Sequence, residues 1–177
     1  VAAMSIINKI SMLIFMPIYG INQGSQPIIG FNYGSKKYDR VKKTLGLAIK
    51  AADIIACIGF VMVEFFPSIL IKLFNTEDTE LIAIAVRGIR IDLMFLPIIA
   101  FQIISSNYFQ AIGKAKISML LSVLRQVIVL IPLILILPRF FGLDGLWFSA
   151  PVSDIISAVI TAIFLIKNIR SLPSMQE

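Results

Sequence analysis

Five long apolar stretches, separated by short polar joints, restrict what this chain can fold into. Their approximate limits are 1–29, 43–70, 78–112, 115–138 and 144–168. About 20 apolar residues span the hydrocarbon core of a bilayer as an α-helix, and each stretch is at least that long. Lipid-exposed backbone must satisfy its own hydrogen bonds, and the alternating pattern of a barrel strand is lacking. The sequence predicts an all-α integral membrane protein with five transmembrane helices.

The composition supports a lipid environment. Hydrophobic residues make up 58% of the 177 residues, whereas soluble domains are usually about 45–50% apolar. The net charge is +6, but the basic residues occupy short blocks between apolar stretches. This arrangement favours a membrane protein over a nucleic-acid-binding surface.

The reactive residue types are few. The chain has one cysteine, Cys57, and no histidine, so an internal disulfide, a zinc site and a Ser/His/Asp site are not expected. No GxxxxGK[ST] nucleotide loop is present, and no close-spaced pair of aspartates suggests membrane catalysis. We therefore predict no enzyme activity, no metal and no cofactor.

Charge asymmetry predicts the orientation. If the five helices alternate in direction, three basic blocks lie on one side of the membrane. These are Lys36, Lys37, Arg40, Lys42 and Lys43 in the first loop, Lys114 and Lys116 in the third, and Lys167 and Arg170 after the fifth helix. The other side has only Lys72 and Arg139. The positive-inside rule then makes the first loop and the C-terminus of this multi-pass cell-membrane protein cytoplasmic.

The joints between the stretches carry turn and capping signals. Residues 30–35 are expected to end the first helix, and 75–78 resemble an N-cap followed by first-turn acids. Gly113, Pro138 and the segment 142–145 separate the later helices. Prolines that could kink the helices are Pro17, Pro27, Pro67, Pro97, Pro132 and Pro151. Val1 begins within apolar sequence without a charged leader, which we interpret as a fragment lacking a signal peptide.

Charged residues inside the apolar stretches are the sharpest candidates for function. They are Asp53, Glu64, Arg87, Arg90, Asp92, Arg125 and Asp154. Each would cost roughly 2.5–3.5 kcal/mol at the bilayer centre on insertion scales. For each of them two roles stay open: a structural role in packing or an ion pair, and a direct role in function. The sequence does not assign Arg125 and Asp154 as partners.

Two helical stripes could line a cavity. At 100° per residue, one face of the first helix carries Ser5, Asn8, Met12, Phe15, Tyr19, Asn22 and Gln26. One face of the third carries Arg87, Met94, Ile98, Gln102, Ser105 and Phe109. Apolar, aromatic and small polar groups together suit lipophilic solutes. The same mixture also occurs at ordinary helix–helix interfaces, so both interpretations stay open.

Three separated motifs resemble the MATE family of multidrug and toxic compound extrusion transporters. They are GINQGSQPIIGFNYG at 20–34, YFQAIGKAK at 108–116 and FGLDGLW at 141–147. The resemblance implies a twelve-helix fold of two six-helix lobes around a central cavity. It places this chain at helices 8–12, in the C-terminal lobe, and implies that the N-terminal lobe is its missing partner.

The resemblance also implies an activity. It is the export of small lipophilic or cationic compounds in exchange for H⁺ or Na⁺, by rocking one lobe against the other. The candidate substrate cavity comprises Asn8, Met12, Phe15, Tyr19, Asn22, Gln26, Met94, Ile98, Gln102 and Ser105. Asp92 and Asp154 are the candidate coupling-ion residues.

One departure from the family pattern concerns coupling. Sodium-coupled members of one branch carry an acid in the helix corresponding to 81–112, about three turns before its closing glycine. Here the stretch 97–105 has no acid, and Asp92 lies earlier on another flank. The chain is more similar to the branch whose coupling acid lies in the N-terminal lobe.

Two other functions remain as alternatives. A flippase for a lipid-linked sugar would need a strongly cationic cavity, for which Arg87, Arg90 and Arg125 are candidates. A membrane enzyme or assembly factor is the third hypothesis, although the catalytic residue patterns expected of an enzyme are missing.

Overall fold

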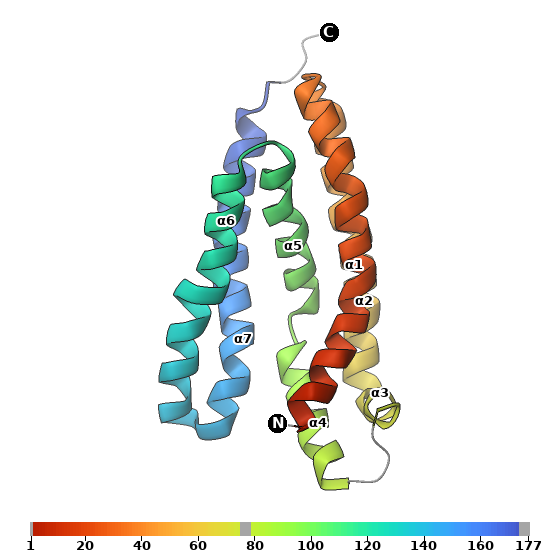
Figure 1. The fold of residues 1–177 in the computed structure, drawn as a ribbon, viewed down its shortest axis with the longest axis vertical. Helices are drawn as coiled ribbons and strands as arrows, with labels where there is room; N and C mark the ends of the chain where they lie inside the picture. Colours follow the sequence, from red (N-terminus) through yellow and green to blue (C-terminus); the bar gives the residue numbers. More distant parts are fainter. Residues whose placement is uncertain (1, 75–78, 174–177) are drawn as a thin grey trace.

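The apolar stretches form long helices that lie roughly side by side in the computed structural model, which describes residues 2–74 and 79–173 (Figure 1). The α-helices are α1 (Ala2–Gly34), α2 (Tyr38–Phe65), α3 (Pro67–Lys72), α4 (Thr79–Asp92), α5 (Leu96–Ala111), α6 (Ala115–Val123) and α7 (Leu130–Ser171). A π-helical segment, η1 (Leu124–Val129), joins α6 to α7. The described residues form no strand.

Four helical stretches of the described chain are individually long and apolar enough to cross a membrane. They are Ala3–Gly34, Tyr38–Phe65, Ala115–Gly142 and Gly145–Ser171. The all-helical membrane fold is therefore confirmed, but the count of five continuous helices is not. The predicted helix 78–112 is wrong as one element, because it is divided into α4 and α5, which follow one another along the bundle (Figure 1).

Helix ends differ from the predicted limits for local reasons. The first helix continues through the predicted turn to Gly34, and Lys36, with φ of 58°, makes the reversal into α2. The second begins at Tyr38 rather than 43 and ends at Phe65 rather than 70. Pro67 lacks the N–H that would continue α2, and it instead occupies the first turn of α3, where no such donor is needed.

The last two predicted helices are joined by a tight reversal. The helix expected to end at 138 runs past Pro138 to Gly142, whose φ of 58° and ψ of −135° interrupt α7. Gly145 then packs directly against the backbone carbonyl of Leu137, a place where a Cβ would collide. The final helix continues to Ser171 rather than 168. The predicted N-cap at 75–78 lies outside the described residues.

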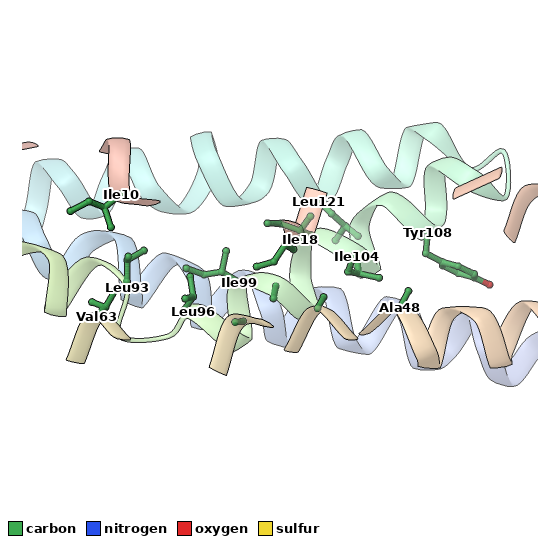
Figure 2. Close-up of a cluster of buried hydrophobic side chains, with 14 of the residues drawn as sticks. Ile10, Ile18, Ala48, Val63, Leu93, Leu96, Ile99, Ile104, Tyr108 and Leu121 are labelled. Carbon is green, nitrogen blue, oxygen red and sulfur yellow. The ribbon is translucent and has the colours of Figure 1, made fainter. Parts of the chain in front are cut away.

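The buried core lies between α1, α2 and α5, with contributions from α4 and α6 (Figure 2). Small residues allow α2 to approach its neighbours, namely Ala48, Ala52, Ala56 and Gly59. A Cβ on Gly59 would meet the side chains of Ile14 and Leu96. Close approach of small residues stabilises helix contacts in lipid, where the hydrophobic effect between helices is weak.

The outward surface is strongly apolar. Leu47, Ile54, Ile58 and Phe65 of α2 are all more than half exposed. In the third membrane-spanning helical stretch, Ala115–Gly142, only 6% of the most apolar 18 residues are buried within the described chain. Such a surface suits contact with lipid or with further transmembrane helices.

The three predicted basic blocks lie at one end of the bundle. The α1–α2 turn, the α5–α6 turn and the described C-terminal end of α7 are together at the top of Figure 1. We call this the basic end. The α6–α7 hairpin reverses at the opposite end of the bundle, at the same level as α3 and the start of α4 but on the other side of the bundle from α3 (Figure 1).

Candidate functional site

A break between α4 and α5 places Asp92 at a helix end. Asp92 is the last residue of α4, and α5 begins four residues later at Leu96. Pro97 cannot donate a hydrogen bond to the carbonyl of Leu93, so a continuous α-helix loses a bond at this point. The N–H of Leu96 bonds to the Leu93 carbonyl instead, closing a tight turn at 3.2 Å. The carboxylate is therefore presented at a bend within the bundle.

A second irregularity presents Arg125. It lies in η1, where the N–H of Leu130 bonds to the Arg125 carbonyl in the wider π pattern. Pro132 follows closely and cannot bond to the carbonyl four residues before it. Short π segments inside α-helices occur frequently at functional sites, because they re-aim side chains.

Arg125 forms an ion pair with Asp154 of α7. The guanidinium Nε donates to Asp154 Oδ1 at 2.7 Å, and the carboxylate side chain is only 6% exposed. The neighbouring Ser153 hydroxyl donates to the Arg125 backbone carbonyl at 2.9 Å. One turn of α7 therefore holds both the side chain and the backbone of Arg125.

These groups line one cavity, which we call the acid cavity. Its volume is about 470 Å³, within the range typical of small-molecule sites. Its walls include Asp92, Arg125, Asp154 and the aromatic rings of Phe15 and Tyr19. Leu93, Ile99, Gln126, Leu130, Ala150 and Ser153 complete the lining. Two carboxyl groups thus share a cavity with one guanidinium.

Asp92 differs from Asp154 in its contacts. The structure gives Asp154 a short bond to Arg125, but gives Asp92 no hydrogen bond or ion pair with any described residue. A carboxylate without a protein partner in a partly apolar cavity is a ready acceptor for a cation. Asp92 is therefore the candidate ligand-binding acid.

Two further cavities adjoin the acid cavity. One of about 150 Å³ shares Tyr19, Arg125 and Gln126 with it and extends to Gln102 and Asn107. The other, of about 580 Å³, shares Asp92, Leu130 and Ala150. The walls of the larger one are mostly apolar and include Met4, Ile84, Ile134, Leu146 and Trp147.

The predicted α1 stripe only partly faces these cavities. Phe15 and Tyr19 line the acid cavity, whereas Asn8 and Met12 are exposed and line none of the three. Asn22 is buried and Gln26 is half-buried, both outside these cavities. The residues of the stripe point to the same side of α1, but the cavities extend along only part of the length of that helix.

The predicted stripe on the helix 78–112 is not one face. Gln102 is buried and borders the smaller cavity, and Ser105 is fully buried. Met94 lies in the break and is 49% exposed, while Ile98 is half-buried outside the three cavities. At 100° per residue these side chains share a face only if the helix is continuous from 87 to 109. The break between α4 and α5 makes that prediction wrong.

Three site features were missed or left open by the sequence. The sequence indicates Arg125 only as a charge in a span, and it gives no signal that singles out Ser153 or Trp147 as site residues. The joint presence of Arg125 and Asp154 in apolar helices was a signal for pairing, but periodicity within one helix gives no relative depth between two helices.

Comparison with known families gives a match over most of the chain. The MatE family model matches residues 1–136. Among curated proteins, the multidrug export protein MepA of Staphylococcus haemolyticus is 24% identical over 154 residues, which are 87% of this chain and 33% of MepA. The uncharacterized transporter YisQ of Bacillus subtilis is 29% identical over 143 residues, or 80% of this chain and 31% of YisQ.

Solved structures show the same fold. The MATE multidrug transporter DinF-BH, solved in complex with a ligand, is 38% identical with a TM-score of 0.85, over 93% of this chain and 37% of DinF-BH. A MOP superfamily transporter from Pyrococcus furiosus has a TM-score of 0.90 at 23% identity, over 99% of this chain and 40% of that protein. The chain spans about a third of the length of the curated relatives it matches.

Proposed function

Because this chain belongs to the MatE family, we propose that it is one part of a membrane exporter of small lipophilic and cationic compounds. The related MepA is a multidrug export protein, and DinF-BH is a multidrug transporter. The chain supplies about a third of the length of such relatives, so the complete transporter needs further helices, which we assign to a second lobe.

The observation that carries the proposal is the acid cavity. Asp92 supplies a carboxylate that makes no hydrogen bond or ion pair with a described residue, and Phe15 and Tyr19 supply aromatic faces beside it. A cation with an apolar body is attracted by both kinds of group, the charge by the carboxylate and the body by the rings. Asp92 also borders the larger apolar cavity beside Trp147, which gives such a body room.

Coupling to an ion gradient is the second part of the proposal. Export against a gradient needs an ion that competes with substrate or changes the cavity, and H⁺ or Na⁺ can do so at a carboxylate. Asp92 and Asp154 are the two acids of the acid cavity and hence the candidates in this chain. Alternating access would come from movement of this lobe against the other.

We further propose that the protein lies in the cell membrane with the basic end on the cytoplasmic side. The three basic blocks are gathered at that end, and positively charged loops are retained in the cytoplasm during insertion. The first loop and the C-terminus would then both be cytoplasmic.

The test uses the complete transporter expressed in bacteria that lack their own efflux pumps. Wild-type protein should lower ethidium accumulation, and Asp92→Asn should reduce this extrusion about tenfold or more, because the amide removes a charge-assisted interaction. Asp39→Asn is the matched control, since Asp39 is an exposed acid at the basic end. Absence of dye extrusion under both proton and sodium gradients would reject the exporter function.

A flippase for a large anionic lipid-linked sugar is the alternative. It requires a cationic cavity, and here Arg125 faces two carboxyl groups, one of which already binds it. Arg90 donates at 2.8 Å to the backbone carbonyl of Glu64, outside the three cavities. The charge balance of the acid cavity therefore favours a cationic substrate, and translocation of a fluorescent lipid-linked sugar by reconstituted protein would reverse that choice.

A further inference from the structure

Four fully buried polar side chains of α5 and α7 have no hydrogen-bond partner among the described residues. Gln102 Oε1, Ser105 Oγ, Ser157 Oγ and Thr161 Oγ1 are buried and make no hydrogen bond in the structure. The residues Ser105, Ser157 and Thr161 are 0% exposed. Buried polar atoms are nearly always satisfied, by protein or by ordered water, so such a group needs a ligand.

Other hydroxyls of the same helices behave differently. The Ser149 hydroxyl donates to the Gly145 carbonyl at 2.7 Å, and the Ser122 hydroxyl donates to the Ser118 carbonyl at 3.0 Å. Serine in a membrane helix commonly satisfies itself in this way. Ser157 and Thr161 do not, although they belong to the same helix as Ser149.

The α7 residues form a narrow stripe between two fixed points. Asp154 bonds to Arg125 of η1, and the Tyr108 hydroxyl of α5 donates to Asn168 Oδ1 at 3.0 Å. At 100° per residue, Ser157 and Thr161 lie within about 60° of both Asp154 and Asn168. They therefore face the same seam between η1 and α5.

The α5 residues fill the remaining length of the seam. Helix α5 and the second half of α7 run in the same direction toward the basic end (Figure 1). Because Tyr108 bonds to Asn168, each α5 residue lies level with the α7 residue whose number is 60 higher. Ser105 is then level with buried Leu165, the one apolar side chain that interrupts the α7 stripe between Thr161 and Asn168.

Gln102 connects the seam to the acid cavity. It borders the 150 Å³ cavity, which shares Arg125 and Gln126 with the acid cavity. Polar groups thus follow one another from Asp154 to Asn168, a distance of about 21 Å at about 1.5 Å per residue. Figure 2 shows Tyr108 at one end of the buried cluster, with Ile104 and Leu121 between it and the middle of the bundle.

We propose that this seam, lined by Gln102, Ser105, Ser157 and Thr161, is hydrated and conducts protons between Asp154 and the basic end of the bundle. Each hydroxyl or water accepts one proton and passes one on, so no group gains or loses a proton overall. The hydroxyls and waters turn back before the next transfer. In exchange for exported substrate, a proton adds to the Asp154 carboxylate from the outer side of the acid cavity. It then leaves through the seam to the basic end, which regenerates the carboxylate. The proposal rests on the proposed exporter function, with H⁺ as its coupling ion.

Protonation of Asp154 has a consequence at the acid cavity. The charged groups that face Asp154 there are Arg125 from η1 and Asp92 from the end of α4. A neutral Asp154 releases the guanidinium, which then competes with a bound cation for Asp92. Arg125 therefore displaces the substrate cation from Asp92 when Asp154 is protonated.

Hydration is tested by hydroxyl-radical labelling of the purified full-length transporter, read by mass spectrometry. Radicals formed from water label side chains beside ordered water even when these are buried. Leu165 of the seam should be labelled, whereas Leu45 of α2, which is 2% exposed against 4% for Leu165, should not. Equal labelling of the two leucines would overturn the hydrated seam.

Conduction is tested by proton-driven substrate transport in proteoliposomes. The double variant Ser157→Ala with Thr161→Val should slow transport about tenfold or more, with substrate affinity unchanged and labelling of Leu165 lost. Thr161→Ser keeps a hydroxyl and should retain transport, and Ser149→Ala is the control for a buried serine that bonds to its own helix. Wild-type rates in the double variant would overturn the proton path.

The two proposals fail in different ways. If wild-type protein moves no substrate under any gradient, the exporter function fails. If wild-type protein moves substrate but takes up no proton for it, the exporter stands and the proton path is wrong.

Discussion

At the scale of single residues, the pairing of Arg125 with Asp154 accounts for two charges inside apolar helices. Burying a lone charge in lipid is costly, and a short bond between opposite charges offsets much of that cost. Asp154 is the more deeply buried partner, since the Arg125 side chain is 28% exposed. Asp92, in contrast, is left available in the same cavity.

Breaking this pair should destabilise the protein. In the full-length transporter, Asp154→Leu leaves a partly buried guanidinium alone, which costs roughly 3–5 kcal/mol for fully buried pairs and less here. Adding Arg125→Met should restore most of the lost stability, because both charges are then gone. Thermal unfolding of purified protein in detergent measures both effects. A double variant as unstable as the sum of the two single variants would contradict the pairing.

At the scale of elements, prolines decide where apolar stretches divide. Pro67 is the first residue of α3 and Pro97 is the second residue of α5, at points where uninterrupted helices were predicted. Pro27 lies within the continuous α1. The residue type is the same in all three places, so packing around the helix decides whether a proline bends, breaks or is simply accommodated.

Straightening the break between α4 and α5 should impair transport without unfolding the protein. Pro97→Ala restores a donor for the Leu93 carbonyl, which favours a continuous helix and moves Asp92 out of the acid cavity. We expect transport to fall about tenfold with thermal stability unchanged or higher. Pro27→Ala, at an exposed site in α1 away from the three cavities, is the control. If both variants transport equally well, the break is not needed to position Asp92.

At the scale of the whole molecule, charge is separated along the bundle. The basic end gathers residues from the α1–α2 turn, the α5–α6 turn and the end of α7. The acid cavity lies within the bundle, between α1, the α4–α5 break, η1 and α7. The proposed exporter would use both features, because orientation would set the direction of export and the cavity would set what is carried.

Cysteine labelling tests the orientation in the full-length protein. Cys57 and any other cysteines of the full-length protein are first replaced by alanine. One cysteine is then introduced in each variant, as Lys36→Cys, Lys116→Cys or Lys72→Cys. A membrane-impermeant maleimide should label the Lys72 variant in intact cells and the other two only in inverted vesicles. The reverse pattern would place the basic end outside the cytoplasm.

Sequence alone determined the membrane fold, the apolar stretches and the gathering of basic blocks at one end, because each depends on composition and spacing along one helix. It also marked Asp92, Arg125 and Asp154 as charges needing an explanation. Only the tertiary structure decided that Arg125 meets Asp154, that Asp92 and Tyr19 share their cavity, and that 78–112 bends. Helical periodicity fixes direction around one axis, whereas partners across helices depend on relative depth, rotation and local breaks, which packing sets.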